Sequence, residues 1–183
     1  MMLNATDELT LDIVESGCVT WDDLVRSVRN FKYGRGADRS DFEGVWYRRK
    51  GTCSTKHGFL KEIANRNGFN NVELMVGIYL MTAENTPSVA TILNTHELQG
   101  IPEAHCYLKV DGSYLDATSN SSDYNKIAAD LLEEKSVDKS FLVSEKIDYH
   151  KEYLMHWLQN EEVPLSLDEL WGIREDCIAA LSE

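Results

Sequence analysis

The stretch "EAHCYLKVDGSYLDAT", residues 103–118, predicts a β-hairpin and indicates the fold class. Asp111 and Gly112 separate two alternating runs, and Asp-Gly in that position is the strongest short-range hairpin signal. With these two residues as the turn, Val110 pairs with Ser113, and the residue numbers of every facing pair sum to 223. Helix-like segments precede and follow this hairpin. The order predicts an α+β fold with an antiparallel sheet in its middle.

The hairpin register also predicts which side chains share a face, because side chains alternate along a strand. The expected core face carries Ala104, Cys106, Leu108, Val110, Ser113, Leu115 and Ala117. The opposite face carries His105, Tyr107, Lys109, Tyr114, Asp116 and Thr118. On that face His105 and Asp116 are diagonal neighbours, roughly 7–8 Å apart along the backbone and within reach of each other. The pattern therefore predicts a His–Asp pair, and makes Cys106 a small buried core residue.

A cysteine in the segment "GTCSTKHGF", residues 51–59, is the candidate partner of this pair. Thr52 or Ser54 can cap a helix that runs to about Asn67, which places Cys53 in its first turn. The helix dipole and the free amides of a first turn favour a thiolate. The segment 45–70 contains six basic residues and one acidic residue, an excess of +5 that favours a thiolate further.

Cys53, His105 and Asp116 together have the residue types of a nucleophilic site. The histidine would take the thiol proton and later protonate the leaving group. The aspartate would fix the histidine tautomer and stabilise the imidazolium. The backbone amide of Cys53 would supply half of an oxyanion hole.

From Trp46 to Thr118, this arrangement resembles the transglutaminase-like superfamily, whose members share a papain-type core. The resemblance rests on "GTC" opening a helix, "EAHCYLKV" on one strand and "SYLDAT" on the next. It implies that Cys53 is the nucleophile, His105 the general base and Asp116 the orienting carboxylate. It also implies chemistry on amide or thioester bonds through an acyl-enzyme, with a peptide, a protein or a small amide as substrate. No cofactor is implied.

The resemblance leaves one oxyanion donor to be found. Trp46 and Tyr47 lie a few residues before Cys53, where papain-like enzymes place such a donor. With Tyr107, on the same hairpin face as His105, they are the candidate oxyanion or substrate residues.

His57 and a metal site are the alternatives to this triad. His57 stands one helical turn after Cys53 and has no carboxylate near it in sequence, so we expect it to support the site rather than to act as the base. A zinc site of Cys53, His57, His105 and Cys106 has suitable residue types. Adjacent strand residues point to opposite faces, so His105 and Cys106 are poorly placed to share a metal, and we expect none.

The remaining segments complete the predicted architecture. Helices are expected over 20–31, 124–134 and 150–159 and from Ser166 onward, and strands over 72–81 and 140–148. We expect one domain over residues 1–183, with the catalytic core at about 46–118 and helical flanks at 1–45 and 119–183.

The composition of the chain limits the classes of partner that it is expected to bind. The chain has 18 basic and 31 acidic residues, a net charge of −13, which argues against nucleic acid and anionic membranes. There is no apolar run long enough to cross a membrane, and the acidic start of the chain differs from a secretory signal. We therefore expect a cytoplasmic protein with four free thiols, its oligomeric state left open. Two functions remain: a cysteine hydrolase or acyltransferase, and a catalytically silent module that binds peptide or protein in the same cleft.

Overall fold

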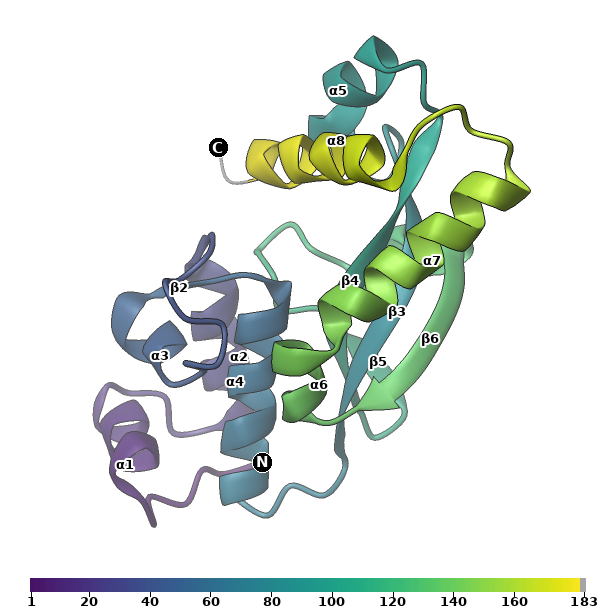
Figure 1. Ribbon diagram of the computed structural model, residues 1–183. Helices are drawn as coiled ribbons and strands as arrows, with labels where there is room; N and C mark the ends of the chain where they lie inside the picture. Colours follow the sequence, from purple (N-terminus) through teal and green to yellow (C-terminus); the bar gives the residue numbers. More distant parts are fainter. Residues whose placement is uncertain (182–183) are drawn as a thin grey trace.

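The middle of the chain forms a four-stranded antiparallel sheet in a computed structural model that describes residues 1–181. Its strand order is β5-β4-β3-β6, and β3 lies between β4 and β6. The strands are β3 (Val72–Thr82), β4 (Gly100–Val110), β5 (Ser113–Leu115) and β6 (Leu131–Val137). Helices precede and follow the sheet (Figure 1), so the predicted α+β fold with a central antiparallel sheet is confirmed.

The hairpin that joins β4 and β5 has the predicted register. Val110 faces Ser113 and Leu108 faces Leu115. Asp111 and Gly112 both have positive φ, 49° and 79°, as a type I′ turn requires. Among the described residues β5 pairs with β4 only as far as Leu108, so residues 100–107 have β3 on one side and no strand on the other. We call this unpaired side the open edge of β4.

The N-terminal helices lie on one side of the sheet, and the last of them packs directly on its strands (Figure 1). They are α1 (Glu8–Glu15), α2 (Trp21–Asn30), α3 (Gly44–Arg48) and α4 (Cys53–Arg66), with short parallel strands β1 (Lys32–Tyr33) and β2 (Lys50–Gly51) beside them. Thr52 caps α4 in a capping box with Thr55, which fixes Cys53 as the first residue of the helix. The inward residues of α4, Phe59 and Leu60 among them, pack with Leu74 of β3 in a single apolar cluster.

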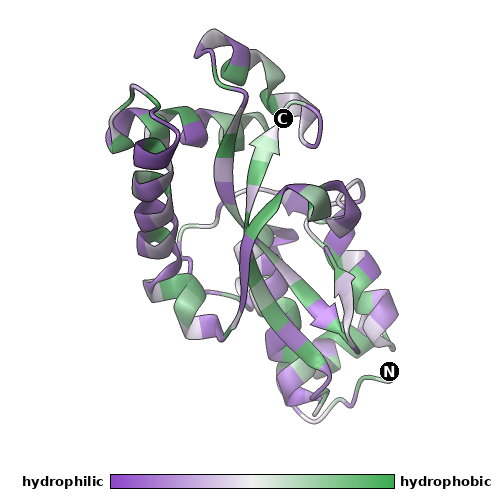
Figure 2. Cartoon of the chain, turned by 90° about the vertical axis from the view of Figure 1, so that its right-hand side faces the viewer, coloured by the Kyte–Doolittle hydropathy of each residue, from purple (hydrophilic) through white to green (hydrophobic). Residues whose placement is uncertain are grey.

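The other face of the sheet is covered by helices from the second half of the chain. These are α5 (Ala90–Thr95), α7 (Lys146–Asn160) and α8 (Leu167–Ala180), the last capped by Ser166 as predicted. α7 buries Leu154 and Leu158 against this face and is otherwise largely hydrophilic (Figure 2). Short 3-10 turns occur at Pro87–Val89, Tyr124–Lys126 and Ala128–Asp130. Within residues 1–181 no helix combines the length and the apolar character that a bilayer crossing needs.

Two predicted elements are wrong, and both lie in the C-terminal flank, residues 119–183. The helix expected over 124–134 does not form. Residues 124–126 and 128–130 are 3-10 turns, and residues 131–137 form strand β6, because β3 offers its second edge and pairs with them from Leu74–Val137 to Tyr79–Leu131. The helix-forming residues of "LLEEKSV" yield to this tertiary pairing. Residues 140–148 form α6 (Lys139–Ser144) and the start of α7 instead of a strand, because the Asp138 side chain accepts from the Phe141 amide and caps α6.

Candidate active site

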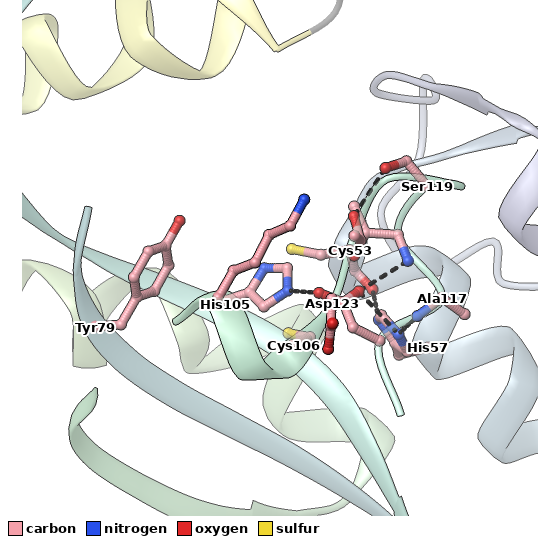
Figure 3. Close-up of polar contacts among 12 residues, drawn as sticks. Cys53, His57, Tyr79, His105, Cys106, Ala117, Ser119 and Asp123 are labelled. Atoms are coloured by element: carbon pink, nitrogen blue, oxygen red, sulfur yellow. Dashed lines mark hydrogen bonds and ion pairs between the residues drawn. The ribbon is translucent and has the colours of Figure 1, made fainter. Parts of the chain in front are cut away.

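The three residues singled out from the sequence come together beside the N-terminus of α4. The Nε2 atom of His105 lies 2.8 Å from Oδ2 of Asp116. The other carboxylate oxygen of Asp116 accepts from the Thr118 amide at 2.9 Å. Because Nε2 is engaged with Asp116, Nδ1 is the ring atom left to interact with Cys53. Figure 3 shows the His105 side chain between Tyr79 and Cys53.

The Cys53 sulfur lies at the open edge of β4. It interacts with the side chains of both His105 and Cys106, which leave the strand on opposite faces. Only a group at the edge of a strand can contact two such neighbours at once. The prediction that Cys106 is merely a buried core residue is therefore incomplete, since its sulfur also lies 3.4 Å from the Ser54 hydroxyl.

The electrostatics of the site favour an ion pair between Cys53 and His105. A hydrogen bond from Cys106, together with the charges of Lys146 and His105, holds the pKa of the Cys53 thiol well below its ordinary value despite burial. Burial would lower the pKa of His105, but Asp116 and Cys53 outweigh it and raise that pKa to about 10. Both shifts favour the charged pair, a thiolate beside an imidazolium, and Asp116 faces the imidazole ring.

His57 supports the triad from inside α4. Its ring is buried, its Nδ1 donates to the carbonyl of Cys53 at 2.8 Å, and its Nε2 accepts from the Ala117 amide at 2.8 Å. Both ring nitrogens are thus occupied, and burial lowers the pKa of the ring. His57 ties the residue after Asp116 to the helix that carries Cys53.

The positive charge beside the thiol comes from Lys146, which the sequence did not single out. Lys146 is the first residue of α7, and its Nζ lies 2.8 Å from the Ser54 hydroxyl and 4.0 Å from the Cys53 sulfur. The basic segment 45–70 contributes little of the expected charge. Arg48 pairs with Asp41 away from the site, and Arg49 lies over the Trp46 ring.

Two cavities meet at Cys53, with volumes of about 320 and 260 Å³. Tyr33, Cys53 and Glu103 line both of them. The larger cavity contains Ser54, Lys146 and Arg174 and extends to the loop 35–39. The smaller cavity contains His105 and Asp116 and extends to the polar loop 118–123. A molecule with its reacting atom at Cys53 would therefore have room on both sides of that atom.

The proposed oxyanion residues do not lie at the thiol, and this prediction is wrong. Trp46 is buried between the rings of Phe31 and Phe59. Tyr47 is 59 % exposed, and its hydroxyl donates to Asp12. Neither residue lines the two cavities.

Tyr107 does not line the cavities either, although it lies on the same strand face as His105. It is buried, and its hydroxyl donates to Glu134 of β6 at 2.7 Å. It therefore serves the packing between β4 and β6 rather than a substrate.

Tyr33 occupies the place that Trp46 and Tyr47 were expected to fill. Strand β1 pairs Tyr33 with Gly51, two residues before Cys53, and so brings the phenol to the wall that the two cavities share. Burial raises the pKa of Tyr33, and the charges of Cys53 and Glu103 raise it further, so the hydroxyl keeps its proton. A two-residue strand paired to another two-residue strand leaves no pattern in the sequence.

His150 is 2 % exposed and lies in the wall of the larger cavity. Its Nε2 lies 2.8 Å from the carbonyl oxygen of Pro102. Next to it Glu103 forms a bidentate ion pair with Arg174 of α8. These contacts join α7 and α8 to the start of β4 and so form the far wall of the larger cavity.

Within the part of the chain that the structure describes, no group of three or more His, Cys, Asp and Glu side chains is arranged to hold a metal ion. Comparison of the chain with protein-family models, with curated proteins and with solved structures found no match. What the site does is therefore inferred from its own geometry.

Proposed function

We propose that this chain is a transglutaminase-like cysteine enzyme, a hydrolase or acyltransferase that acts on amide or thioester bonds. One observation carries the proposal: a histidine held by a carboxylate at 2.8 Å faces a cysteine at the first position of a helix. This is the relation between nucleophile, base and orienting group that covalent acyl transfer requires.

The first half of the reaction forms the acyl-enzyme. The Cys53 thiolate attacks the carbonyl carbon, a C–S bond forms, and the carbonyl oxygen takes the negative charge. As the C–N or C–S bond of the substrate breaks, Nδ1 of His105 gives its proton to the leaving amine or thiol. Asp116 holds the ring throughout and stabilises its charged form.

The second half of the reaction releases the acyl group. His105, now neutral, takes a proton from water or from an acceptor amine, which attacks the thioester carbon. The C–S bond breaks, Cys53 returns to its thiolate form and the His105 imidazolium is restored. Whether water or an amine attacks decides between hydrolysis and transfer.

The oxyanion would be held by the backbone amide of Cys53 and the hydroxyl of Tyr33. Amides in the first turn of a helix have no acceptor within the helix and point toward its N-terminal end. Tyr33 lies in the cavity wall that also contains Cys53. Two donors on one developing charge are the usual requirement of acyl transfer.

The shape of the site favours an amide with a substituent on each side of the carbonyl, such as a peptide bond. Each cavity, of about 320 or 260 Å³, is at the small end of ligand pockets, so each would take one side chain or a short segment.

Intact-mass detection of an acyl-enzyme tests the proposal directly. The protein would be incubated with a panel of peptide esters, peptide thioesters and glutamine amides, and a mass increase equal to the acyl group is expected on Cys53. Cys53→Ala should abolish the increase, whereas Cys177→Ala, which changes a thiol in the opposite apolar cluster, should keep it. Binding of peptides without any adduct, together with an ordinary thiol pKa near 8.5, would favour the silent binding module instead.

A further inference from the structure

We propose that Cys53 and Cys106 form a peroxide-responsive dithiol, in which Cys106 captures oxidised Cys53 as a reversible disulfide. This chemistry needs no acyl substrate, so it stands or falls separately from the proposed enzyme activity.

The geometry of the two thiols carries the proposal. A single hydroxyl, that of Ser54, lies 3.9 Å from the Cys53 sulfur and 3.4 Å from the Cys106 sulfur. Both cysteines are free thiols in the structure. Cys53 begins α4 and Cys106 lies on the face of β4 that packs against α4, so the two side chains approach each other from adjacent layers.

The two thiols differ in access to solvent, as an attacking and a resolving thiol must. Cys53 is 7 % exposed and lines both cavities, whereas Cys106 is 0 % exposed and lines neither. A small hydroperoxide entering either cavity therefore meets Cys53 first. The cations around Cys53, Lys146 at 4.0 Å and the His105 ring, favour the thiolate that reacts with peroxide.

The first step oxidises Cys53 to a sulfenic acid. The thiolate attacks one oxygen of the hydroperoxide, an S–O bond forms, and the O–O bond breaks. The leaving hydroxide or alkoxide takes a proton, which the His105 imidazolium can supply, and departs as water or an alcohol. Sulfur loses two electrons and the peroxide gains them.

The second step closes the disulfide. The Cys106 sulfur attacks the Cys53 sulfur, the S–O bond breaks, and the hydroxide that leaves takes the Cys106 proton to form a second water. A disulfide requires Cβ atoms about 3.5–4.5 Å apart, and the two side chains already meet at the Ser54 hydroxyl. The product blocks the nucleophile and protects it from irreversible oxidation to the sulfinic acid.

Non-reducing peptide mapping after a low dose of hydrogen peroxide tests the proposal. The expected product is an intramolecular cross-link between the peptides of Cys53 and Cys106, with the mass of the chain reduced by two hydrogens. Dithiothreitol should restore full iodoacetamide labelling of Cys53. Cys18→Ser and Cys177→Ser remove the other two thiols and should leave the cross-link unchanged.

The Cys106→Ser variant separates capture from simple oxidation. In this variant the sulfenic acid of Cys53 should persist long enough for dimedone to trap it, and further peroxide should cause a loss of labelling that dithiothreitol cannot reverse. Dimedone trapping in the wild type at the same yield as in the variant, with no cross-link, would overturn the proposal. If the variant fails to fold, the presence or absence of the wild-type cross-link decides alone.

Discussion

Removal of the Lys146 charge is the sharpest test of how the site activates its thiol. The Lys146 ammonium lies 4.0 Å from the Cys53 sulfur and 2.8 Å from the Ser54 hydroxyl. Lys146→Gln keeps a hydrogen-bond donor for Ser54 and removes the charge. Lys146→Arg keeps the charge and changes the shape of the group.

The size of the effect follows from the distance. Two opposite unit charges 4 Å apart attract by about 4 kcal/mol at an effective dielectric of about 20 and by about 1 kcal/mol in water. One pKa unit corresponds to about 1.36 kcal/mol, so these limits become roughly 3 units and just under 1 unit. Lys146 is only partly buried in the cavity wall, so the effect of its charge on the pKa of Cys53 should lie between these two limits. We expect Lys146→Gln to raise the pKa of Cys53 by about 1 to 3 units.

The assay is the rate of iodoacetamide alkylation of Cys53 as a function of pH, with the modified residue identified by peptide mapping. The Lys146→Gln profile should shift to higher pH, and the Lys146→Arg profile should stay near that of the wild type. Lys126→Gln is a matched control, because Lys126 lines the smaller cavity and donates to the Ser121 carbonyl instead of contacting the thiol. If Lys146→Gln moves the profile no further than Lys126→Gln does, the charge of Lys146 does not hold the thiolate.

Three further predictions address the oxyanion donor, the choice of histidine and a buried lysine. Tyr33→Phe should lower kcat on a reactive ester by about 10²–10³ with little change in KM, and unchanged steady-state kinetics would remove Tyr33 from the oxyanion site. His57→Gln should keep most of the turnover, because glutamine can still donate to the Cys53 carbonyl and accept from the Ala117 amide. His105→Gln should lose nearly all of the turnover. The opposite ranking in the same ester assay would show that His57 is the base. Burial lowers the pKa of Lys56 from its ordinary 10.5 to about 8, so between these values the unfolded chain binds more protons than the folded one. The free energy of unfolding of the wild type should therefore rise relative to that of Lys56→Met by up to about 3 kcal/mol from pH 8 to pH 10.5. Urea denaturation of both proteins measures this difference in stability, and a difference that stays flat or falls with pH would contradict the pKa assignment.

The sequence alone determined the features that depend on neighbouring residues. Asp111 and Gly112 fixed the turn, because few residues adopt positive φ at both positions, and the turn fixed the register. The paired register ends at Leu108 and Leu115, and the predicted contact between His105 and Asp116, 2.8 Å long, forms just beyond it. Thr52 set the first residue of α4, and with it the position of Cys53, through a capping box that spans only four residues.

Tertiary structure alone decided everything that depends on which segments meet. Residues 131–137 became a strand because β3 had an unpaired edge, and local propensity pointed the other way. Tyr33 and Lys146 reach the thiol from 20 residues before it and 93 residues after it, so no spacing near Cys53 could indicate them. Cys106 joined the site because β5 ends at Leu115 and leaves β4 with an open edge, where one sulfur can contact side chains from both faces. Periodicity predicts on which face of a strand a side chain lies, but only the packed sheet shows at which residue the pairing with the next strand ends.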